Sequence, residues 1–424
     1  MKVLFISLNR ESINMRVVPL GLACVAQSAI DAGHSVRILD LLEVDNISNS
    51  VKAEIYNFNP DVIGLSIRNI DNQDMKNTEF YYKKDRKIIK EIKNYSKSIV
   101  VLGGAGYSIY PDIILKDTGA DFGIQGEGEK IFPLLLEKLS HNNPLNNIPQ
   151  LYFNDGHQGK TKYIKTNLDK FPLPSPKLFW QFSEKHFDDL WIPVQTRRGC
   201  PLSCSYCSTA LIEGKIIRKR DPLKIVKWLK ELEDYGINNF YFVDNTFNIP
   251  ESYALELCKA IIDAKLKIKW RCIIYPYKLS EKLCNAVAKT GCCEVSLGFE
   301  SVNDVVLKGM NKLYCKTDIE EASKNLKKYG IKIVGFLMLG APFDTVDSIK
   351  ESLDFADSLE LDALKITTGI RIYPYTKLAE QALIDGIINK NDNLLTPRFY
   401  INTSLKNNIC EIITEFKSQH PYCI

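Results

Sequence analysis

The chain has 424 residues, of which 45% are hydrophobic and 25% are charged, which is typical of a globular protein of two or three domains. Its 55 basic and 51 acidic side chains are well mixed and leave a net charge of +4, which argues against a nucleic-acid partner. No apolar run approaches the roughly 18 residues of a membrane span, and Met1 runs straight into a predicted strand. We therefore expect a cytoplasmic protein without a membrane partner.

Short apolar runs alternate with helical stretches over the first 135 residues. The predicted strands are 2–8, 36–40, 62–66, 99–103 and 122–125, and the predicted helices are 17–32, 51–57 and 81–95. This alternation predicts a parallel sheet with helices on both faces, in a first domain over residues 1–140.

Glycines and small polar residues follow three of these strands at their carboxyl ends. The three clusters contain Ser66 and Arg68, then Gly103 and Gly104, and then Gln125, Gly126 and Glu127. Open parallel sheets bind ligands at this edge, so the three loops predict a ligand site. The first strand-to-helix turn lacks G-x-G-x-x-G, and the pattern alone leaves the kind of ligand open.

Residues 141–185 form a predicted linker, with a Pro- and Asn-rich connector, a hairpin over 151–163 and an extended stretch over 171–176. Strand and helix then alternate from 186 to 386. The strands are 192–196, 239–243, 268–274, 294–297, 332–339 and 363–366, and the helices between them are 222–235, 251–264, 280–290, 319–329 and 345–359. Six such units predict a partial (βα)6 barrel with its site at the strands' carboxyl ends. Residues 387–424 are expected to be a short polar extension.

Three of the 12 cysteines, Cys200, Cys204 and Cys207, are spaced C-x3-C-x2-C in one loop. Three thiolates in so short a loop suit a cubic [4Fe–4S] cluster whose fourth iron stays open for a small molecule. A structural zinc site needs a fourth ligand at comparable spacing, and no nearby Cys or His supplies one. The loop is therefore the predicted catalytic centre and metal site.

With Tyr206 before the last cysteine, the motif C-x3-C-x-aromatic-C resembles the radical S-adenosylmethionine (SAM) superfamily. The resemblance implies that the amino and carboxylate groups of SAM chelate the open iron. It further implies that an electron from the cluster cleaves SAM to methionine and a 5′-deoxyadenosyl radical. A reductase such as flavodoxin or ferredoxin is the expected protein partner.

The same resemblance implies further contacts to SAM after the later strands of the barrel. Asp244 and Asn245 are expected at the amino group of SAM, although the segment could equally cap a helix. The candidate contacts to the ribose and adenine of SAM are Gly298, Glu300, Ser301, Gly335 and Met338. Tyr375 replaces the glycine of the family's P-G-T element, which puts that turn in doubt.

The glycine-rich series of the first domain looks like the Rossmann-like B12-binding domain of cobalamin-dependent radical SAM enzymes. It implies that a base-off cobalamin lies among six residues of the three loops: Ser66, Gly103, Gly104, Gln125, Gly126 and Glu127. The cobalt-ligating motif D-x-H-x-x-G is absent, and His157 lies in a predicted surface turn. Arg68 is a candidate for the lower face of cobalt, with a phosphate or surface contact as the alternative.

The resemblance implies a methyltransferase in which one SAM methylates cobalamin and a second yields the radical. The expected reaction is methylation of an unactivated carbon, or of phosphorus, in a natural-product or peptide intermediate. The alternative is cyclisation, rearrangement or SAM-derived group transfer, with or without cobalamin. A sensor is disfavoured because no DNA-binding helix-turn-helix is found, and methylthiolation because there is no second cysteine triplet.

Overall fold

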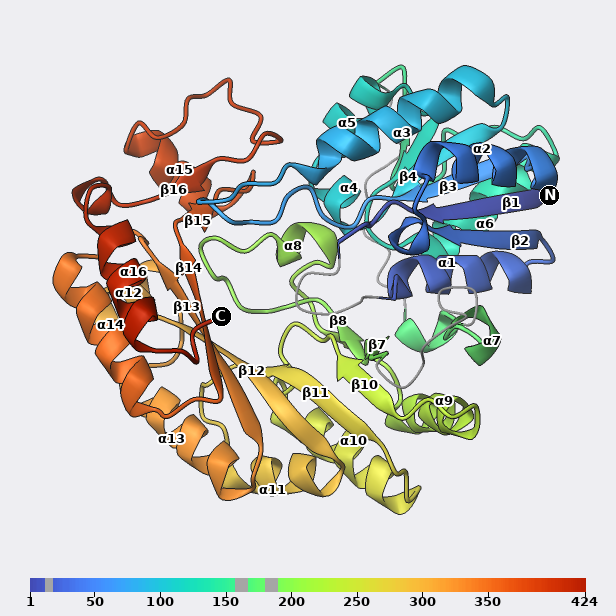
Figure 1. The fold of residues 1–424 in the computed structure, drawn as a ribbon. Coiled ribbons are helices and arrows are strands. Elements are labelled where there is room, and N and C mark those ends of the chain that lie inside the picture. The colour runs from blue at the N-terminus through green and yellow to red at the C-terminus, as the bar shows by residue number, and fades with distance from the viewer. Residues whose placement is uncertain (12–17, 157–166, 180–189) are drawn as a thin grey trace.

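The structure is a computed structural model that describes residues 1–11, 18–156, 167–179 and 190–424. The predictions for His157 and for the far part of the hairpin lie outside these residues. The described chain forms two α/β halves, each built on a six-stranded sheet (Figure 1). Within the described residues, no helix combines the length and the apolar character that a membrane crossing requires.

The first half is a sheet in the order β2-β1-β3-β4-β5-β6, with helices on both faces (Figure 1). The strands are β1 (Lys2–Ser7), β2 (Ser35–Asp40), β3 (Val62–Ser66), β4 (Ile99–Gly103), β5 (Phe122–Ile124) and β6 (Leu151–Phe153). The helices are α1 (Leu20–Asp31), α2 (Ile47–Phe58), α3 (Tyr81–Tyr95), α4 (Ala105–Ile109), α5 (Pro111–Thr118) and α6 (Gly128–Ser140). The first five strands run parallel, which confirms the predicted Rossmann-like fold.

The four central residues of strand β1, Val3 to Ile6, are all apolar. Val3 and Phe5 pack against α1 and α6 on one face, while Leu4 and Ile6 pack on the other face in the same core as residues of α2 and α3. A strand buried on both faces cannot alternate polar and apolar residues. Strand β6 runs antiparallel to β5, so the start of the predicted hairpin adds an edge strand to this sheet.

The second half is a partial barrel of six parallel strands in the order β14-β13-β12-β11-β10-β7, as predicted. The strands are β7 (Ile192–Val194), β10 (Asn239–Phe242), β11 (Lys269–Ile274), β12 (Cys292–Glu300), β13 (Lys332–Leu339) and β14 (Ala363–Thr368). The helices outside them are α9 (Pro222–Asp234), α10 (Glu251–Asp263), α11 (Glu281–Lys289), α12 (Asp304–Gly309), α13 (Lys316–Lys328) and α14 (Val346–Ser358). Short elements at the junction are α7 (Pro176–Phe179), β8 (Arg197–Arg198), α8 (Thr209–Ile212) and β9 (Arg218–Lys219).

The carboxyl-terminal residues differ from the short polar extension that was predicted. Strand β16 (Phe399–Tyr400) pairs with β15 (Ile370–Arg371), and α15 (Lys377–Ile384) precedes it. Helix α16 (Ile409–Gln419) packs on α14 through buried residues that recur at helical spacing, Ile409, Ile413 and Phe416. The tail is therefore packed into the core, because α16 buries one helical face and apolar residues before it, such as Ile401 and Leu405, are buried too.

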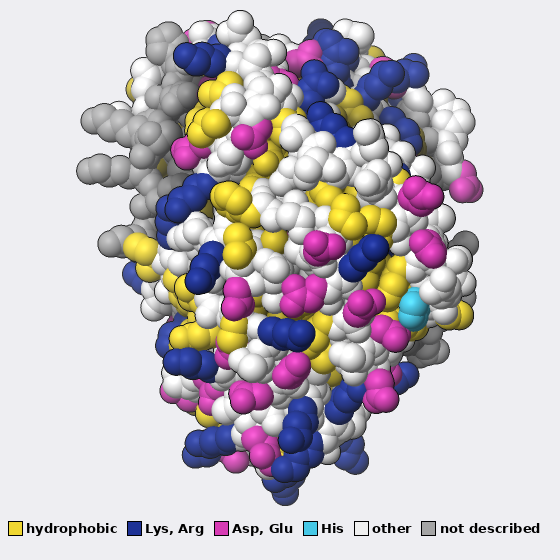
Figure 2. Space-filling view, turned by 90° about the vertical axis from the view of Figure 1, so that its left-hand side faces the viewer, with side chains coloured by type: hydrophobic (Ala, Val, Ile, Leu, Met, Phe, Trp, Pro, Cys, Tyr) yellow, Lys and Arg dark blue, Asp and Glu magenta, His cyan; other side chains and the backbone are white. Residues whose placement is uncertain are grey.

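The side of the molecule that carries α12 to α16 is shown in Figure 2. Lys, Arg, Asp and Glu side chains are interspersed there, with apolar side chains between them (Figure 2). This face carries no large field of one sign, in keeping with the balanced composition of the chain.

Candidate active site

The three predicted cluster ligands lie in the loop between β8 and α8. Cys200, Cys204 and Cys207 are free thiols that are partly exposed. Gly199 starts the loop with a φ of +88°, and a Cβ there would lie 2.2 Å from the carbonyl oxygen of Ile216. Only glycine fits this close approach, so the residue before Cys200 fixes how the chain enters the loop.

The donor set of this loop fits a [4Fe–4S] cluster. Burial raises the pKa of the Cys200 thiol to about 11, and burial likewise raises the pKa of Cys204. In the described residues no three His, Cys, Asp or Glu side chains are grouped closely enough for a single metal ion. A [4Fe–4S] cluster does not need three ligands around one ion, since each cysteine binds a different iron.

Glu300, Tyr206 and Lys312 meet beside the loop. The Glu300 carboxylate accepts hydrogen bonds from the Tyr206 hydroxyl at 2.9 Å and from the Lys312 ammonium at 3.2 Å. The Lys312 ammonium also lies 5.1 Å from the centre of the Tyr206 ring. Lys312 is not recognisable as a site residue from the sequence, because a lysine just after a short helix gives no local signal of burial.

Asp244 and Asn245, both predicted at the amino group of SAM, have different surroundings. The Asp244 carboxylate is fully buried and accepts from the Thr196 hydroxyl at 2.6 Å and from two backbone amides. Asn245 lines a cavity and donates to Glu213 at 2.7 Å. Glu213 also accepts from the backbone amide of Gly199 at 3.0 Å, so this network reaches the start of the cluster loop.

The remaining barrel candidates fall on two faces of the sheet. Gly298 and Met338 lie on its concave side, which the helices leave uncovered. A Cβ on Gly335 would instead lie 2.5 Å from Leu361, under the helices. Ser301 is fully buried, with its hydroxyl 3.2 Å from that of Ser352 on α14. Successive side chains of a strand point to opposite faces of the sheet, so Gly335 and Met338, three residues apart on β13, face opposite sides.

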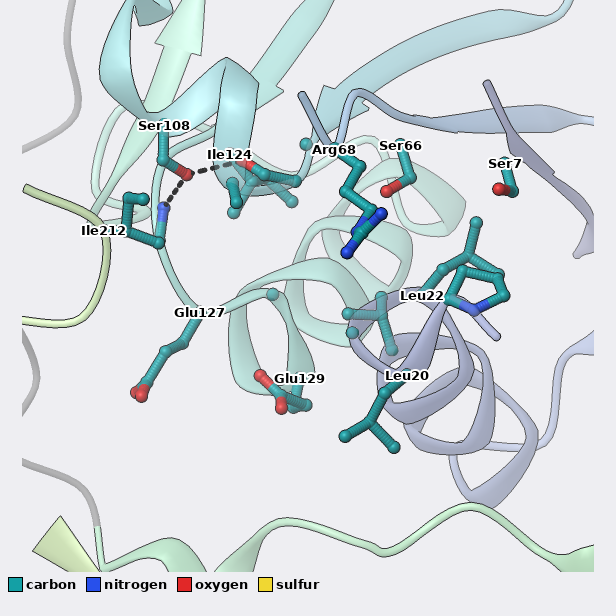
Figure 3. A pocket seen from close by; sticks show the side chains of 18 of the residues that line it. Ser7, Leu20, Leu22, Ser66, Arg68, Ser108, Ile124, Glu127, Glu129 and Ile212 are labelled. Atoms are coloured by element: carbon teal, nitrogen blue, oxygen red, sulfur yellow. Dashed lines mark hydrogen bonds between the residues drawn. The ribbon is translucent and has the colours of Figure 1, made fainter. Parts of the chain in front are cut away.

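A cavity of about 550 Å³ lies between the two halves (Figure 3). Six of the seven predicted cobalamin contacts line it: Ser66, Arg68, Gly103, Gly104, Gly126 and Glu127. The barrel contributes further lining residues, including Gln195, Arg198, Glu213 and Asn245. The amide of the seventh, Gln125, donates to the Ser108 carbonyl at 2.9 Å, and its side chain is not part of the lining.

The glycine loops let the backbone approach the contents of this cavity closely. Gly104 has a φ of +102°, and a Cβ there would lie 2.4 Å from the Ile67 carbonyl oxygen. Phe5, Leu22 and Phe132 give the cavity an apolar wall between α1, α6 and the sheet. A glycine-lined, largely apolar cavity of this size fits a large flat cofactor better than a small polar metabolite.

Four charged side chains join the cavity to the cluster loop. The Arg198 guanidinium lies 2.5 Å from Glu129 and 3.3 Å from Glu127, and Arg218 lies 2.7 Å from Glu127. Burial alone would raise the pKa of Glu129, but the charge and hydrogen bond of Arg198 outweigh it and hold that pKa below its usual value. Figure 3 shows Glu127 and Glu129 side by side at the cavity. Arg198 lies two residues before Cys200. These ion pairs therefore hold the cluster loop against the segment that carries Glu127 and Glu129.

Two family models match the chain where these features lie. The model of the B12 binding domain matches residues 6–136, and that of the Radical SAM superfamily matches residues 194–356. The chain belongs to the B12-binding radical SAM enzymes. Membership implies a [4Fe–4S] cluster, SAM and cobalamin as cofactors.

Relatives of this B12-binding radical SAM enzyme match over most of its length. An uncharacterised methyltransferase of Pyrococcus horikoshii is 28% identical over 92% of this chain and 84% of its own. The tryptophan 2-C-methyltransferase of Streptomyces laurentii is 21% identical over 88% of this chain and 73% of its own. The radical SAM methyltransferase TsrM of Kitasatospora setae, solved with cobalamin and a [4Fe–4S] cluster, superposes with a TM-score of 0.87 at 19% identity, over 100% of this chain and 92% of its own. That likeness establishes the shared fold.

Proposed function

We propose that this radical SAM enzyme transfers a methyl group from SAM, by way of cobalamin, to a carbon or phosphorus of a small natural-product or peptide intermediate. The observation that supports this most strongly is that the glycine loops and the barrel line the same cavity, which lies next to the cluster loop. When bound, the cluster supplies electrons, SAM supplies methyl and adenosyl groups, and cobalamin carries methyl. The cytoplasmic location and the reductase partner stay predictions.

The chain's own residues would position these groups. Cys200, Cys204 and Cys207 would each hold one iron. Glu300 offers a hydrogen-bond acceptor for the ribose hydroxyls of SAM, and Lys312 offers a positive charge for the carboxylate of SAM. Because Glu300 and Lys312 pair with each other, these contacts would require the two side chains to separate. The remaining SAM and cobalamin contacts predicted from the sequence stay part of this proposal.

Asp244 would act through the backbone rather than on SAM directly. Its two carboxylate oxygens already accept three hydrogen bonds from Thr196 and Arg197, directly before the cluster loop. Asn245, which lines the cavity, is the better placed of the two to contact a ligand.

Arg68 would cover the lower face of cobalt. Its side chain extends from the end of β3 into the cavity (Figure 3), and among the described residues it makes no ion pair. In Arg68→Lys, the shorter and more strongly hydrated ammonium should let water reach the metal. We expect a shifted absorption spectrum of bound cobalamin with unchanged cobalt content. A wild-type spectrum would reject this role for Arg68.

Metal content tests the proposal as a whole. The protein is produced in cells supplied with hydroxocobalamin, purified without oxygen and reconstituted with iron and sulfide. About four irons per chain and one cobalt are expected. With methyl-deuterated SAM, a reductant and candidate acceptors, label should pass to one acceptor and S-adenosylhomocysteine should form. Iron without cobalt would overturn the methyl-transfer proposal and favour cyclisation or SAM-derived group transfer.

A further inference from the structure

Helix α8 follows the cluster loop and lies at the junction of the two halves, where it contacts α4 (Figure 1). Glu213, directly after this helix, has a carboxylate that accepts three hydrogen bonds. The donors are the Gln195 amide at 2.7 Å, the Asn245 amide at 2.7 Å and the Gly199 backbone amide at 3.0 Å. The carboxylate therefore closes the cluster loop from behind, since it joins the residue after α8 to the residue before Cys200.

The charge of Glu213 is held by neutral donors alone. Within the described residues no cation pairs with this carboxylate, and Arg218, which donates to the Glu213 backbone carbonyl at 3.2 Å, pairs with Glu127 instead. The pKa of the Cys200 thiol is raised first by burial and further by nearby negative groups, of which Glu213 is one. Glu213 thus places an uncompensated negative charge beside the cluster loop.

The hydroxyl of Thr209, at the first position of α8, lies between the last cysteine of the loop and this network. Its oxygen is 3.2 Å from the Cys207 sulfur and 3.4 Å from the Asn245 carbonyl oxygen. Asn245 turns that oxygen toward Thr209 because its NH2 group donates to Glu213. A thiolate that binds iron has no proton, so the single proton of the hydroxyl is free to point at the Cys207 sulfur. Thr209 is therefore placed to donate to a predicted cluster ligand.

The two side chains should act on the electron affinity of a bound cluster in opposite directions. Reduction adds one negative charge to the cluster. A hydroxyl that donates to a ligand sulfur stabilises the reduced form, and hydrogen bonds to the sulfurs and net charge are among the features that set cluster potentials. The carboxylate of Glu213 repels the added electron, and it does so more strongly when the cavity that it lines holds a cofactor instead of water.

We propose that Thr209 and Glu213 are positioning residues that set the reduction potential of the cluster in opposite directions. Thr209 raises the potential through the Cys207 sulfur, and Glu213 lowers it through its charge. The redox step concerned is the uptake of one electron from an external low-potential reductant, with no bond formed or broken. A lower potential makes the cluster a stronger electron donor, so Glu213 favours reductive cleavage of SAM while Thr209 limits how negative the potential becomes. This inference rests on the proposed function, since it takes the three cysteines of the loop as the cluster ligands.

A redox titration of the cluster-loaded protein, without SAM or acceptor, tests this proposal. The protein is reduced stepwise with titanium(III) citrate in the presence of mediators, and the electron paramagnetic resonance signal of the reduced cluster is recorded at each potential. Thr209→Val removes the hydroxyl with little change in volume, whereas Thr209→Ser keeps it. Glu213→Gln removes the charge. Glu411→Gln is the matched control, because Glu411 is an exposed carboxylate on α16, which packs on the outer helix α14.

The midpoint potential should become less negative in Glu213→Gln and more negative in Thr209→Val. Each change is expected to alter the equilibrium constant for reduction about threefold to tenfold, or roughly 30–60 mV for one electron. Thr209→Ser and Glu411→Gln should keep the wild-type potential, and Thr209→Val/Glu213→Gln should lie between the two single variants. Unchanged potentials, or shifts in the same direction, would overturn the inference, since a merely loosened loop gives no reason for opposite shifts.

Iron content separates the remaining outcomes. Loss of iron in Glu213→Gln would overturn the assignment to Glu213 in favour of a purely structural role, and Thr209 would then be judged from its valine and serine variants. A wild type that holds no [4Fe–4S] cluster after reconstitution would count against the proposed function instead.

Discussion

Replacing Arg198 with methionine is expected to lower the free energy of unfolding by about 3–5 kcal/mol, because it leaves the buried Glu129 carboxylate without its partner. Both side chains are enclosed at the junction, with 10% and 3% of their surfaces exposed. Urea unfolding near neutral pH measures the loss. In the double variant Arg198→Met/Glu129→Gln the uncompensated charge is gone, so much of the lost stability should return.

The pH dependence separates this explanation from simple loss of packing. In the wild type Arg198 holds the pKa of Glu129 below its unfolded value, so the pair stabilises the fold above that value and the contribution is lost as pH falls through the folded pKa. In Arg198→Met burial should raise the pKa of Glu129 instead. The defect should then be largest near neutral pH and shrink in acid, where the carboxyl is protonated. A defect that stays constant with pH would contradict the charge explanation.

Changing Cys200, Cys204 and Cys207 together to alanine is expected to abolish reductive cleavage of SAM. Without three thiolates the loop cannot hold a [4Fe–4S] cluster, so iron content should fall to background together with 5′-deoxyadenosine formation. The three side chains are only partly buried, so the circular dichroism spectrum should not change. Cys410→Ala is the matched control, because Cys410 is an exposed cysteine on α16.

Iron content and product analysis check this prediction side by side. The control should keep its iron and its 5′-deoxyadenosine. Continued formation of 5′-deoxyadenosine by the triple variant would refute the assignment of the cluster ligands. Loss of iron with a changed circular dichroism spectrum would mean that the loop is needed for folding as well, which the partial exposure of the cysteines argues against.

Most of the fold could be predicted from the sequence. Strands β3, β4 and β13 and helix α3 begin and end at the predicted residues, and polar residues or glycine mark many of these ends, such as Asp61, Ser98 and Gly340. The cavity-lining loops could also be predicted, since the carboxyl ends of parallel strands meet at one edge. Helix α16 was missed because its apolar residues are few and are recognisable only by their spacing.

The side-chain partners within the site could not be predicted in the same way. Glu300 and Lys312 are close in sequence, but Tyr206 joins them from 94 residues away, and Glu129 meets Arg198 across 69 residues. The first grouping depends on how loops of the barrel come together and the second on how the two halves dock, and no local pattern records either. The sequence also could not tell which polar residues are already satisfied, and Asp244, held by backbone amides, is the clearest case.

The two halves are joined by buried charges at a second place besides Arg198. Arg371, on β15, lies 2.8 Å from Asp71 of the first half, and both side chains are almost fully enclosed. Parting the halves would have to break both pairs together, so we expect the two halves to move as one body and rarely to open. The rate at which cobalamin enters finished protein, measured after hydroxocobalamin is added to cobalamin-free enzyme, would then report how often the halves part.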